Sequence, residues 1–582
     1  FGSRHLLSWT YPNAAPRELL AMGVNTLWTY GINDHVDKLP PLPADLKVSG
    51  NFRIDFVAAC EKYGIVPHPA FSPHSEGEQK GQRKPSKTLE DGSRPDTGDG
   101  PTEGPILAVQ TMLVDRAAMQ VTSKLLVSSN RLEVLRFSSC RLDAEMLGLL
   151  REGLKDLCTV AALQIDWNPL EIPVDKDAVA KAQADGDAEE VNELERKRVQ
   201  QQAQRTLQAF GEAMQVQCGE IEDAIRAVVK TMCEDNPDGE ADLTMEPLDV
   251  AAWLQAFHKS LHFPADYVQQ VFTLLDGPLF GGEGNGCVSL NRLHDVLLEV
   301  LICPPPSASE EAAGDKRKST VAKPVAVEEV KDPIGDVFAS FVDSTSLLEL
   351  VSFRCCDLSR LETSVIARAI RGNLPNLPPS PHLRALNLWG NRICDNGVAP
   401  FAEALECHFG LQYLGLGKNL ITHVGLQKLC RPLGFMRIDR KDEADAINKE
   451  IKEKAKERDK RAKAPPIAKK DARGRERYML EFYMPSLEDR KDAETGETFW
   501  LYGRNMVLKT LNLEHNPVSD VATVLRVQSY GVGDLVLRKT KCAEELLDLK
   551  AKAEAEGDPN AWLQPIPGGL PGGGQGWNLV LQ

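Results

Sequence analysis

Residues 383–429 read LRALNLWGNRICDNGVAPFAEALECHFGLQYLGLGKNLITHVGLQKL, and this stretch decides the fold. Within it the frame L-x-x-L-x-L-x-x-N-x-I begins at Leu383 and begins again 28 residues later, at Leu411. The alternating apolar residues predict a short strand in each unit, and the apolar spacing after it predicts a helix. Because neither unit can bury its apolar face alone, we expect neighbouring units to stack. We expect the asparagine of each frame to bond backbone groups where its strand ends.

The same frame recurs four more times along the chain. Its further copies begin at Leu132, Val160, Leu348 and Leu508. The copies at Leu132 and Leu348 carry cysteine in place of the asparagine. The period, the frame and the cysteine variant resemble leucine-rich repeats of the ribonuclease-inhibitor type, whose repeats carry a full helix on the convex side. The resemblance implies an α/β solenoid, curved like a horseshoe, and covers roughly a third of the chain.

The spacing of the copies indicates two insertions. The gap from Val160 to Leu348 is 188 residues, and the gap from Leu411 to Leu508 is 97. A solenoid tolerates insertions in its loops because each repeat contacts only its neighbours, so we expect one solenoid of about six strands that is interrupted twice. The predicted segments are an N-terminal helical docking segment (1–74), a disordered linker (75–104), the first repeats (105–172), a helical insertion (173–331), the central repeats (332–435), a charged basic insertion (436–505), the last repeat (506–535) and a C-terminal tail (536–582).

Composition restricts the class of protein. A chain of 582 residues, 42% of them hydrophobic, has enough material for several domains with ordinary cores. It has no apolar run near the ~18 residues that a membrane span needs. Its 13 cysteines include no C-x-x-C pair, which favours a reducing compartment over a disulfide framework. The net charge of −16 argues against general nucleic-acid binding.

The first insertion contains a helix–loop–helix pattern at residues 271–301, which is similar to an EF-hand. The residues at loop positions 3, 5, 6 and 8 would be Glu283, Asn285, Gly286 and Val288. In an EF-hand the glycine makes the sharp turn, and the aliphatic residue at position 8 pairs with the partner loop. Leu243 is the candidate for that partner contact. We therefore predict an all-α, paired EF-hand-like module inserted into the solenoid.

The ligand positions of this module argue against calcium. Calcium needs a bidentate carboxylate at position 12, where the second loop has Arg292. In the first loop, Leu243 at position 8 puts Pro247 at position 12. A register shifted by one brings Asp235 and Glu246 to positions 1 and 12, but it moves Leu243 off position 8 and puts Glu240 where the turn needs glycine. The sequence favours a module without metal, and a calcium sensor is the alternative.

The second insertion is basic. Residues 437–477 contain 16 Lys or Arg and 10 Asp or Glu, and the charge spacing predicts an exposed helix. Two readings stay open, a solvated single helix and a basic arm that docks on an acidic surface such as tubulin. The cations of the predicted arm are Lys449, Lys452, Lys456, Lys460 and Arg461. After it, residues 489–505 predict a loop or hairpin with a Thr-Gly turn.

In the implied architecture, the outward residues of the strands line the concave face and form the candidate partner-binding surface. The predicted residues are Arg136, Gln164, Asp166, Arg354, Asn387, Trp389, Asn512 and Glu514. Trp389 is the strongest candidate because aromatic side chains are enriched among interface anchors. We expect Arg354 to neighbour it, and Gly415 and Gly417 to leave room for an incoming partner. The alternative is that Trp389 only covers an exposed strand edge.

The sequence contains no P-loop motif, no H-E-x-x-H motif and no G-x-S-x-G motif. We therefore predict a protein that is not an enzyme and that uses no cofactor and no metal. The repeats, the polar helices and the basic arm predict a scaffold that touches several protein partners. No nucleic acid or membrane is expected among those partners. The tail ends in the mostly apolar WNLVLQ, which we expect to order by docking.

A further resemblance concerns residues 52–71, FRIDFVAACEKYGIVPHPAF, which resemble lead-in segments of leucine-rich-repeat proteins of ciliary axonemes. The resemblance implies a structural subunit of a large cytoskeletal assembly, in the central apparatus or radial spokes of a cilium or flagellum. It also implies an association with microtubules. The alternative is a soluble, calcium-responsive adaptor or an inhibitor of a cytosolic enzyme.

Overall fold

The structure is a computed structural model. It describes residues 38–71, 106–127, 132–154, 159–170, 188–218, 220–234, 247–261, 263, 265–282, 284–302, 332–343, 346–371, 382–408, 410–462, 486–491, 496–528, 533–556 and 577–581. The predicted linker 75–104 therefore lies outside the described residues. The chain divides into two compact units. Unit 1 comprises residues 1–168, 345–353 and 470–477, and unit 2 comprises 169–344, 354–469 and 478–582.

Unit 1 contains four parallel strands that follow the apolar frame. In sheet order they are β1 (Ile106–Gln110), β2 (Val134–Ser138), β3 (Ala162–Asp166) and β6 (Leu350–Ser352). Leu135 pairs with Leu163, and Leu163 pairs with Val351, so the three predicted frames are in register. The strand β1 lies in the segment predicted to hold the first repeats but precedes the first predicted frame, which begins at Leu132. It contributes Leu107 and Val109 to the core.

The helices of unit 1 are α3 (Phe52–Tyr63), α4 (Arg116–Leu126) and α5 (Ala144–Gly153), with a short 3-10 turn, η1 (Pro69–Phe71). Asn51 caps α3 by accepting from the Ile54 N–H, and Gly64 ends it in the left-handed conformation. The ring of Phe71 lies 5.1 Å from that of Phe56 and 6.3 Å from that of Phe137 in β2. The described part of the N-terminal segment thus packs against the first repeats.

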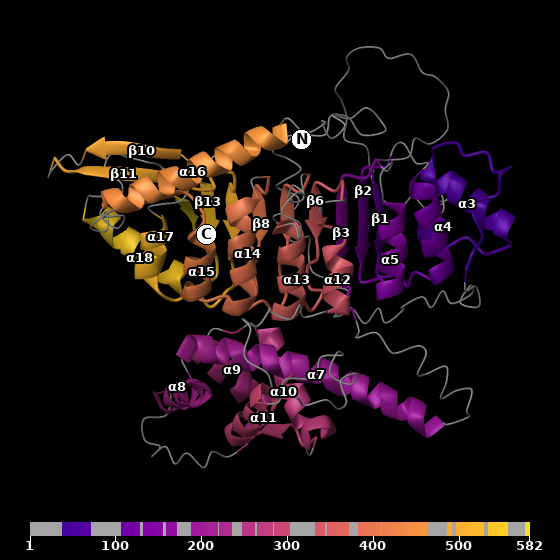
Figure 1. The fold of residues 1–582 in the computed structure, drawn as a ribbon. Helices are drawn as coiled ribbons and strands as arrows, with labels where there is room; N and C mark the ends of the chain where they lie inside the picture. Colours follow the sequence, from indigo (N-terminus) through magenta and orange to yellow (C-terminus); the bar gives the residue numbers. More distant parts are fainter. Residues whose placement is uncertain are drawn as a thin grey trace, which may run out of the picture. The chain divides into compact units, whose positions relative to one another are not determined.

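Unit 2 continues the same pattern with five parallel strands. In sheet order they are β7 (Ala385–Asn387), β8 (Tyr413–Gly415), β12 (Thr510–Asn512), β13 (Gly533–Val536) and β14 (Trp577–Val580). Its repeat helices are α12 (Pro333–Ala339), α13 (Arg360–Arg371), α14 (Asp395–Cys407), α15 (His423–Cys430), α17 (Val521–Gln528) and α18 (Lys541–Ala555). Figure 1 shows α13, α14 and α15 side by side along the strands. The sheet extends beyond the predicted last repeat, because β13 and the tail strand β14 join it.

Buried asparagines close the strand ends of the four frames that carry asparagine, as the frame predicts. The Asn419 side-chain oxygen accepts from the N–H of Ile393, 3.1 Å away in the preceding repeat. Its amide nitrogen donates to the carbonyls of Leu388, Leu416 and Gly417 at 3.0–3.1 Å. The equivalent residues Asn168, Asn391 and Asn516 also bond both their own repeat and the preceding one or its turn. Each amide therefore fastens two neighbouring repeats together.

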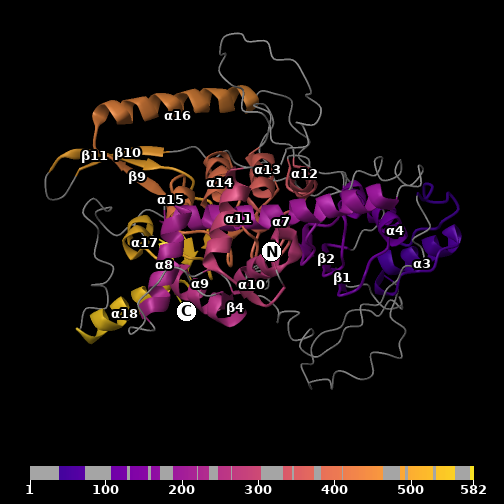
Figure 2. The same cartoon turned by 90° about the horizontal axis from the view of Figure 1, so that it is seen from below.

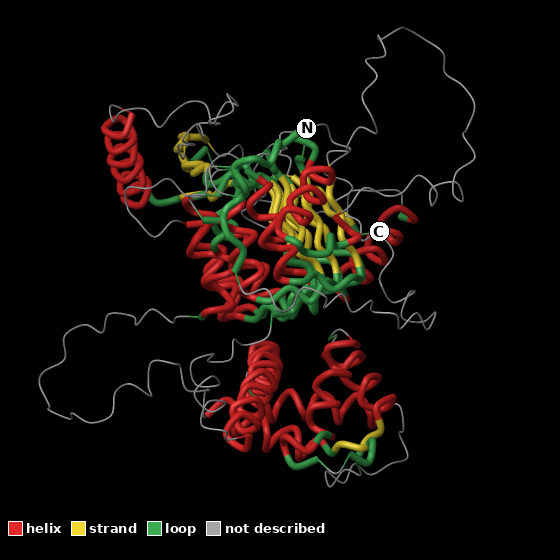
Figure 3. The backbone as a smooth tube through the Cα atoms, turned by 90° about the vertical axis from the view of Figure 1, so that its right-hand side faces the viewer, coloured by secondary structure: helices red, strands yellow, loops and turns green. Residues whose placement is uncertain are grey.

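The first insertion folds into helices with one short strand pair. Its elements are α7 (Ala188–Cys218), α8 (Ile221–Glu234), β4 (Leu248–Asp249), α9 (Val250–Leu261), α10 (Ala265–Asp276), η3 (Pro278–Phe280), β5 (Cys287–Val288) and α11 (Leu290–Ile302). Figure 3 shows the strand pair in yellow among the red helices. Val288 pairs with Leu248 in antiparallel fashion. The prediction that Leu243 is its partner was wrong in register, and Leu243 itself lies outside the described residues.

The long helix α7 supplies part of the core of this insertion. Leu207, Phe210 and Met214 recur at helical spacing on one face of α7 and are fully buried. The ring of Phe210 lies 5.1 Å from that of Phe263 and 5.7 Å from those of Phe257 and Tyr267. The helices α9, α10 and α11 thus close around α7.

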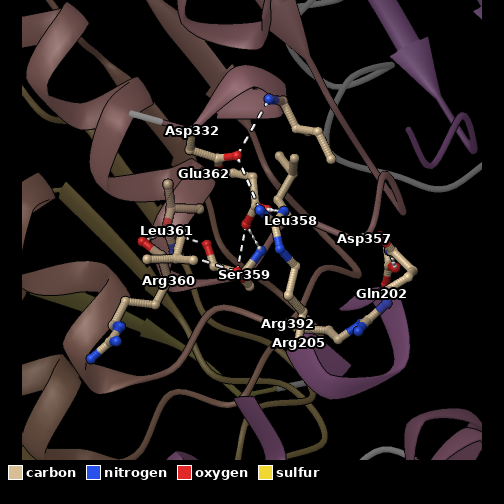
Figure 4. Close-up of polar contacts among 12 residues, drawn as sticks. Gln202, Arg205, Asp332, Asp357, Leu358, Ser359, Arg360, Leu361, Glu362 and Arg392 are labelled. Carbon is tan, nitrogen blue, oxygen red and sulfur yellow. Dashed lines mark hydrogen bonds and ion pairs between the residues drawn. The ribbon is translucent and has the colours of Figure 1, made fainter. Parts of the chain in front are cut away.

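A neighbouring face of α7 is fastened to the repeats by buried ion pairs (Figure 4). Arg205 lies 2.9 Å from a carboxylate oxygen of Glu362 and 3.5 Å from one of Asp332. Both acids also bond helix starts: Asp332 caps α12, and Glu362 accepts from the backbone and hydroxyl of Ser359 before α13. One guanidinium therefore balances two buried carboxylates that shape two repeats.

Arg392, a residue of the repeats, makes a second set of contacts with α7. It is 5% exposed, pairs with Asp357 and donates to the hydroxyl of Thr206 on α7. Its guanidinium lies 5.8 Å from the ring centroid of Tyr267, whose hydroxyl donates to the Thr206 carbonyl at 2.9 Å. Burial lowers the pKa of Arg392 to about 10. These contacts pack the inserted helices directly against the repeats.

The second insertion forms a small antiparallel sheet and one helix. The sheet order is β10 (Ser486–Lys491), β11 (Thr498–Gly503) and β9 (Phe435–Ile438), and α16 spans Lys441–Ala462. Strands β10 and β11 pair from Lys491 opposite Thr498, which confirms the hairpin. Figures 1 and 2 show α16 lying beside β10 and β11.

Replacing Asn419 by alanine tests the asparagine links. The substitution leaves one N–H and three carbonyls without their side-chain partner in a buried site, so we expect the free energy of unfolding to fall by about 2–4 kcal/mol. Urea unfolding of the full chain measures it. Asn448→Ala, at an exposed position on α16, is the matched control and should stay within about 0.5 kcal/mol of the parent. Equal effects of the two substitutions would refute the structural role.

The buried acid Asp332 predicts a pH-dependent stability. Burial, followed by the charge of Glu362, raises the pKa of Asp332 from 3.8 to about 6 despite the opposing effect of Arg205. The folded state thus binds this proton more tightly than the unfolded state. Its stabilising contribution is full below about pH 3.8 and is lost as pH rises through about 6.

Asp332→Asn cannot ionise but keeps an oxygen that can accept at the start of α12. We therefore expect its stability relative to the parent to be more favourable at about pH 7.5 than at about pH 5. Urea unfolding of both proteins at the two pH values measures the difference. A difference that does not change with pH would contradict the raised pKa.

Candidate interaction surface

The strand frame determines which side chains reach the open face of the sheet. Leucines of the frame point into the core, and the residues between them point to the opposite face. In unit 1 the predicted residues Arg136 and Gln164 are register partners on β2 and β3, and both are half-buried. Asp166 lies at the end of β3, where its carboxylate accepts from the Ser352 hydroxyl at 2.6 Å. The other predicted residues, from Arg354 onward, belong to unit 2 and are described separately.

In unit 2 the surface is centred on Trp389. The guanidinium carbon of Arg354 lies 5.1 Å from the centroid of the Trp389 ring, which confirms their predicted proximity. The ammonium of Lys418 lies 5.3 Å from the same centroid. Cations this close to an indole ring are attracted by its π-electrons. The indole nitrogen of Trp389 is covered and has no hydrogen-bond partner among the described residues.

Lys418 was missed from the sequence. It directly precedes Asn419 of the frame, and alternation alone would not place it beside Trp389. Its backbone has a φ of +50°, in the left-handed region, which breaks the alternation at the end of the strand. Gly390 and His515 have the same conformation at the equivalent place in their repeats, with φ of +74° and +57°. A positive φ recurring before the asparagine is a signal that the frame itself does not show.

Gly415, the last residue of β8, and Gly417, two residues after the strand, both lie beneath side chains of neighbouring repeats. A Cβ on Gly417 would lie 2.5 Å from Cδ1 of Trp389 and 2.9 Å from Cγ of Glu514. A Cβ on Gly415 would lie 2.7 Å from Oδ1 of Asn387. The prediction that these glycines leave room for a partner was therefore wrong, because large side chains of neighbouring strands lean into that space. The side chains of Trp389 and Glu514 therefore cover Gly417 and form the surface at this place.

The predicted residues Asn387 and Asn512 support this surface from below. Each is 4% exposed. Asn387 Oδ1 accepts from the N–H of Trp389 at 3.1 Å, and Asn512 Oδ1 accepts from the N–H of Glu514 at 2.9 Å. Tyr413 is also buried here, and burial raises its pKa to about 12. These polar side chains hold Trp389 and Glu514 in position and are mostly out of reach of a partner.

A second exposed set lies on α16. Lys449, Lys452 and Lys456 of the predicted basic arm are exposed. The side chains of Lys460 and Arg461 lie outside the described set, although their backbone belongs to α16. The helix contacts β9 and β10 near its start. It therefore presents most of its length to solvent or to a partner.

A metal-binding cluster and a membrane-spanning helix are both absent from the part of the chain that the structure describes. Within it, no group of three or more His, Cys, Asp and Glu side chains is placed to hold a metal ion. Likewise, none of the described helices combines the length and the apolar character that crossing a bilayer requires.

Comparison with known families agrees with the geometry. A family model described as Leucine Rich repeat matches residues 380–402 and 504–522, which contain the frames that begin at Leu383 and Leu508. No curated protein matches the chain. The matched segments agree with the parallel strands and with the asparagines at positions 391 and 516. The chain therefore contains leucine-rich repeats in an α/β fold with a parallel sheet, and such repeats indicate a role in binding other proteins.

Proposed function

We propose that this protein is a non-enzymatic scaffold, an interaction subunit of a large cytoskeletal assembly, and that the assembly is the ciliary axoneme. The observation that carries the proposal is the surface around Trp389, where an aromatic ring and two cations stand on the open face of the sheet. Half-exposed aromatic and arginine side chains on a rigid support are typical anchors of protein interfaces. The resemblance of residues 52–71 to axonemal proteins favours a place in the central apparatus or the radial spokes.

The arrangement of the insertions supports a subunit with several neighbours. Helix α16 is exposed along much of its length and stands on a different element from the Trp389 surface. A scaffold in a large assembly uses separate surfaces for separate partners. We propose that a microtubule-associated partner contacts α16, separately from the partner at the Trp389 surface.

We propose that the repeats belong to the ribonuclease-inhibitor type and form a horseshoe solenoid. The helices α13 and α14 support this type, because they are 12 and 13 residues long and follow their strands at the predicted place. The parallel pairing of successive frames, with Leu386 opposite Leu414, supports stacked repeats.

We propose that the first insertion is a paired EF-hand-like module that binds no calcium. The pairing of Leu248 with Val288 supports the loop pairing. Arg292 donates from Nε to the Leu275 carbonyl at 3.0 Å and from Nη2 to the Phe280 carbonyl, so its guanidinium fills the loop where a cation would bind. Moreover, α7 already occupies the apolar interior of the module. These observations disfavour the alternative, a calcium-responsive adaptor.

Calcium titration tests the proposal that the EF-hand-like module binds no calcium. We expect isothermal titration calorimetry of the full chain to show no binding heat up to about 1 mM calcium, which is the weak end of EF-hand affinities. The physical reason is the positive charge of Arg292 at the position that needs a carboxylate. A calcium sensor titrated under the same conditions is the control. A saturable micromolar site would favour the adaptor instead.

Extraction from ciliated cells tests the proposed assembly. We expect the tagged chain to stay with the detergent-insoluble cytoskeleton and to leave only at high salt. Trp389→Ala should shift it to the soluble fraction, because the anchor ring of the interface is lost. Trp500→Ala, on the hairpin of the second insertion, removes the same side-chain type elsewhere and should remain insoluble. Full release of the parent chain by mild buffer would contradict an axonemal subunit.

A further inference from the structure

We propose that the strand ends of unit 2 bind an acidic peptide segment of the partner protein. This inference rests on the proposed function and names the chemistry of the partner at the same surface. The row of side chains involved, called the basic ledge, consists of Arg354, Trp389, Lys418, Arg538 and Lys539, together with Glu514.

Backbone hydrogen bonds place the members of the basic ledge on consecutive strands. The N–H of Cys355, next to Arg354, donates to the Trp389 carbonyl at 2.9 Å. The N–H of Lys418 donates to the Glu514 carbonyl at 2.6 Å, and the N–H of His515 donates to the Arg538 carbonyl at 2.8 Å. With neighbouring strands about 4.8 Å apart, the row from Arg354 to Arg538 spans roughly 19 Å. About six extended residues of a peptide cover that distance.

The charge of the basic ledge differs in sign from that of the whole chain. It holds four cations and one carboxylate, whereas the chain carries a net charge of −16. Glu514 is already engaged, since its Oε1 accepts from the amide of Asn512 at 3.3 Å. A local positive patch in an acidic protein attracts carboxylates and repels other basic surfaces.

Trp389 concentrates the positive charge. Arg354 and Lys418 both lie within 5.3 Å of its ring centroid, so the two charges are at most about 10 Å apart, close to one Debye length at physiological salt. Dissolved ions therefore screen the repulsion between Arg354 and Lys418 only in part. A carboxylate between them would offset that repulsion and pair with both, while the indole ring holds the two side chains in place.

The basic arm on α16 is the rival site for an acidic partner, but its charges nearly cancel. Residues 441–462 contain eight Lys or Arg and seven Asp or Glu. The acids lie among the cations along the exposed helix. A carboxylate that approaches α16 therefore meets neighbouring acids, whereas the described residues that make up the basic ledge include one acid, Glu514.

Fluorescence anisotropy of the full chain with a labelled peptide of ten glutamates tests the proposal. We expect saturable binding that weakens strongly when NaCl rises from about 0.05 M to about 0.5 M. The double variant Arg354→Glu/Lys418→Glu should weaken binding at least about tenfold. The double variant Lys449→Glu/Lys452→Glu on α16 makes the same change in net charge and should stay within about twofold of the parent. Thermal unfolding confirms that both variants fold.

Several outcomes would overturn the inference. One is equal binding of the glutamate peptide by the parent and the ledge variant, and another is loss of binding only in the α16 variant. If a peptide of ten lysines bound as tightly as the glutamate peptide, the positive charge of the basic ledge would not explain binding. A single-stranded oligonucleotide of matched length that binds more tightly than the glutamate peptide would identify a nucleic acid as the ligand instead.

The extraction assay separates this inference from the proposed function. If Trp389→Ala and the ledge variant both stay in the insoluble cytoskeleton, the surface itself is not the interface, and the proposed site fails. If Trp389→Ala is released while the ledge variant is retained, the interface stands and the acidic partner is refuted. Release of both supports the proposed function and the inference together.

Discussion

The structure depends on how each strand is ended. In a solenoid the backbone leaves the sheet once per repeat, and the N–H and carbonyl groups at that corner lose their ladder partners. The buried amide of Asn419 bonds four of them, two in its own repeat and two in the preceding one. The link therefore fixes both the corner of one repeat and its distance from the next. Because Trp389 and Lys418 sit at such corners, the same bonds set the geometry of the exposed surface.

This local closure explains how two long insertions leave the strand pairing intact. The strands on either side of the first insertion still pair, with Leu163 opposite Val351, and those around the second pair with Leu414 opposite Leu511. Each repeat needs only its neighbour, so the chain can depart and return between two repeats. The first insertion is also fastened by Arg205 and Arg392, whose desolvation is offset by buried acids and hydrogen bonds.

The sequence was sufficient for the repeats that keep the whole frame, because apolar alternation and a corner asparagine or cysteine are both local signals. It was not sufficient for β1 and β13. Thr540 stands at the corner after β13, where its hydroxyl donates to the Leu537 carbonyl, and Met112 stands at the corner after β1. The strand β14 was also missed, since a short apolar tail after a glycine-rich stretch has no period of its own.

The candidate site was predictable in part for a related reason. Alternation along the strand identified Trp389 and Arg354 as outward residues, and register brought them together. The positive φ that turns Lys418 toward the ring, and the collapse of large side chains over Gly417, depend on neighbouring strands that no local pattern contains. Burial likewise gives Asn387 and Asn512 a supporting role that their outward positions in the frame did not indicate.

The tail strand β14 has a consequence for the behaviour of the protein in concentrated solution. An uncovered strand at the rim of a sheet is a template on which another chain can polymerise. Trp577–Val580 runs parallel to β13 and takes up the hydrogen bonds of that rim, with Leu579 opposite Leu535. The edge of the sheet therefore lies at the four-residue strand β14 instead of at β13. Removal of these residues would expose the backbone N–H and carbonyl groups of β13 to other chains.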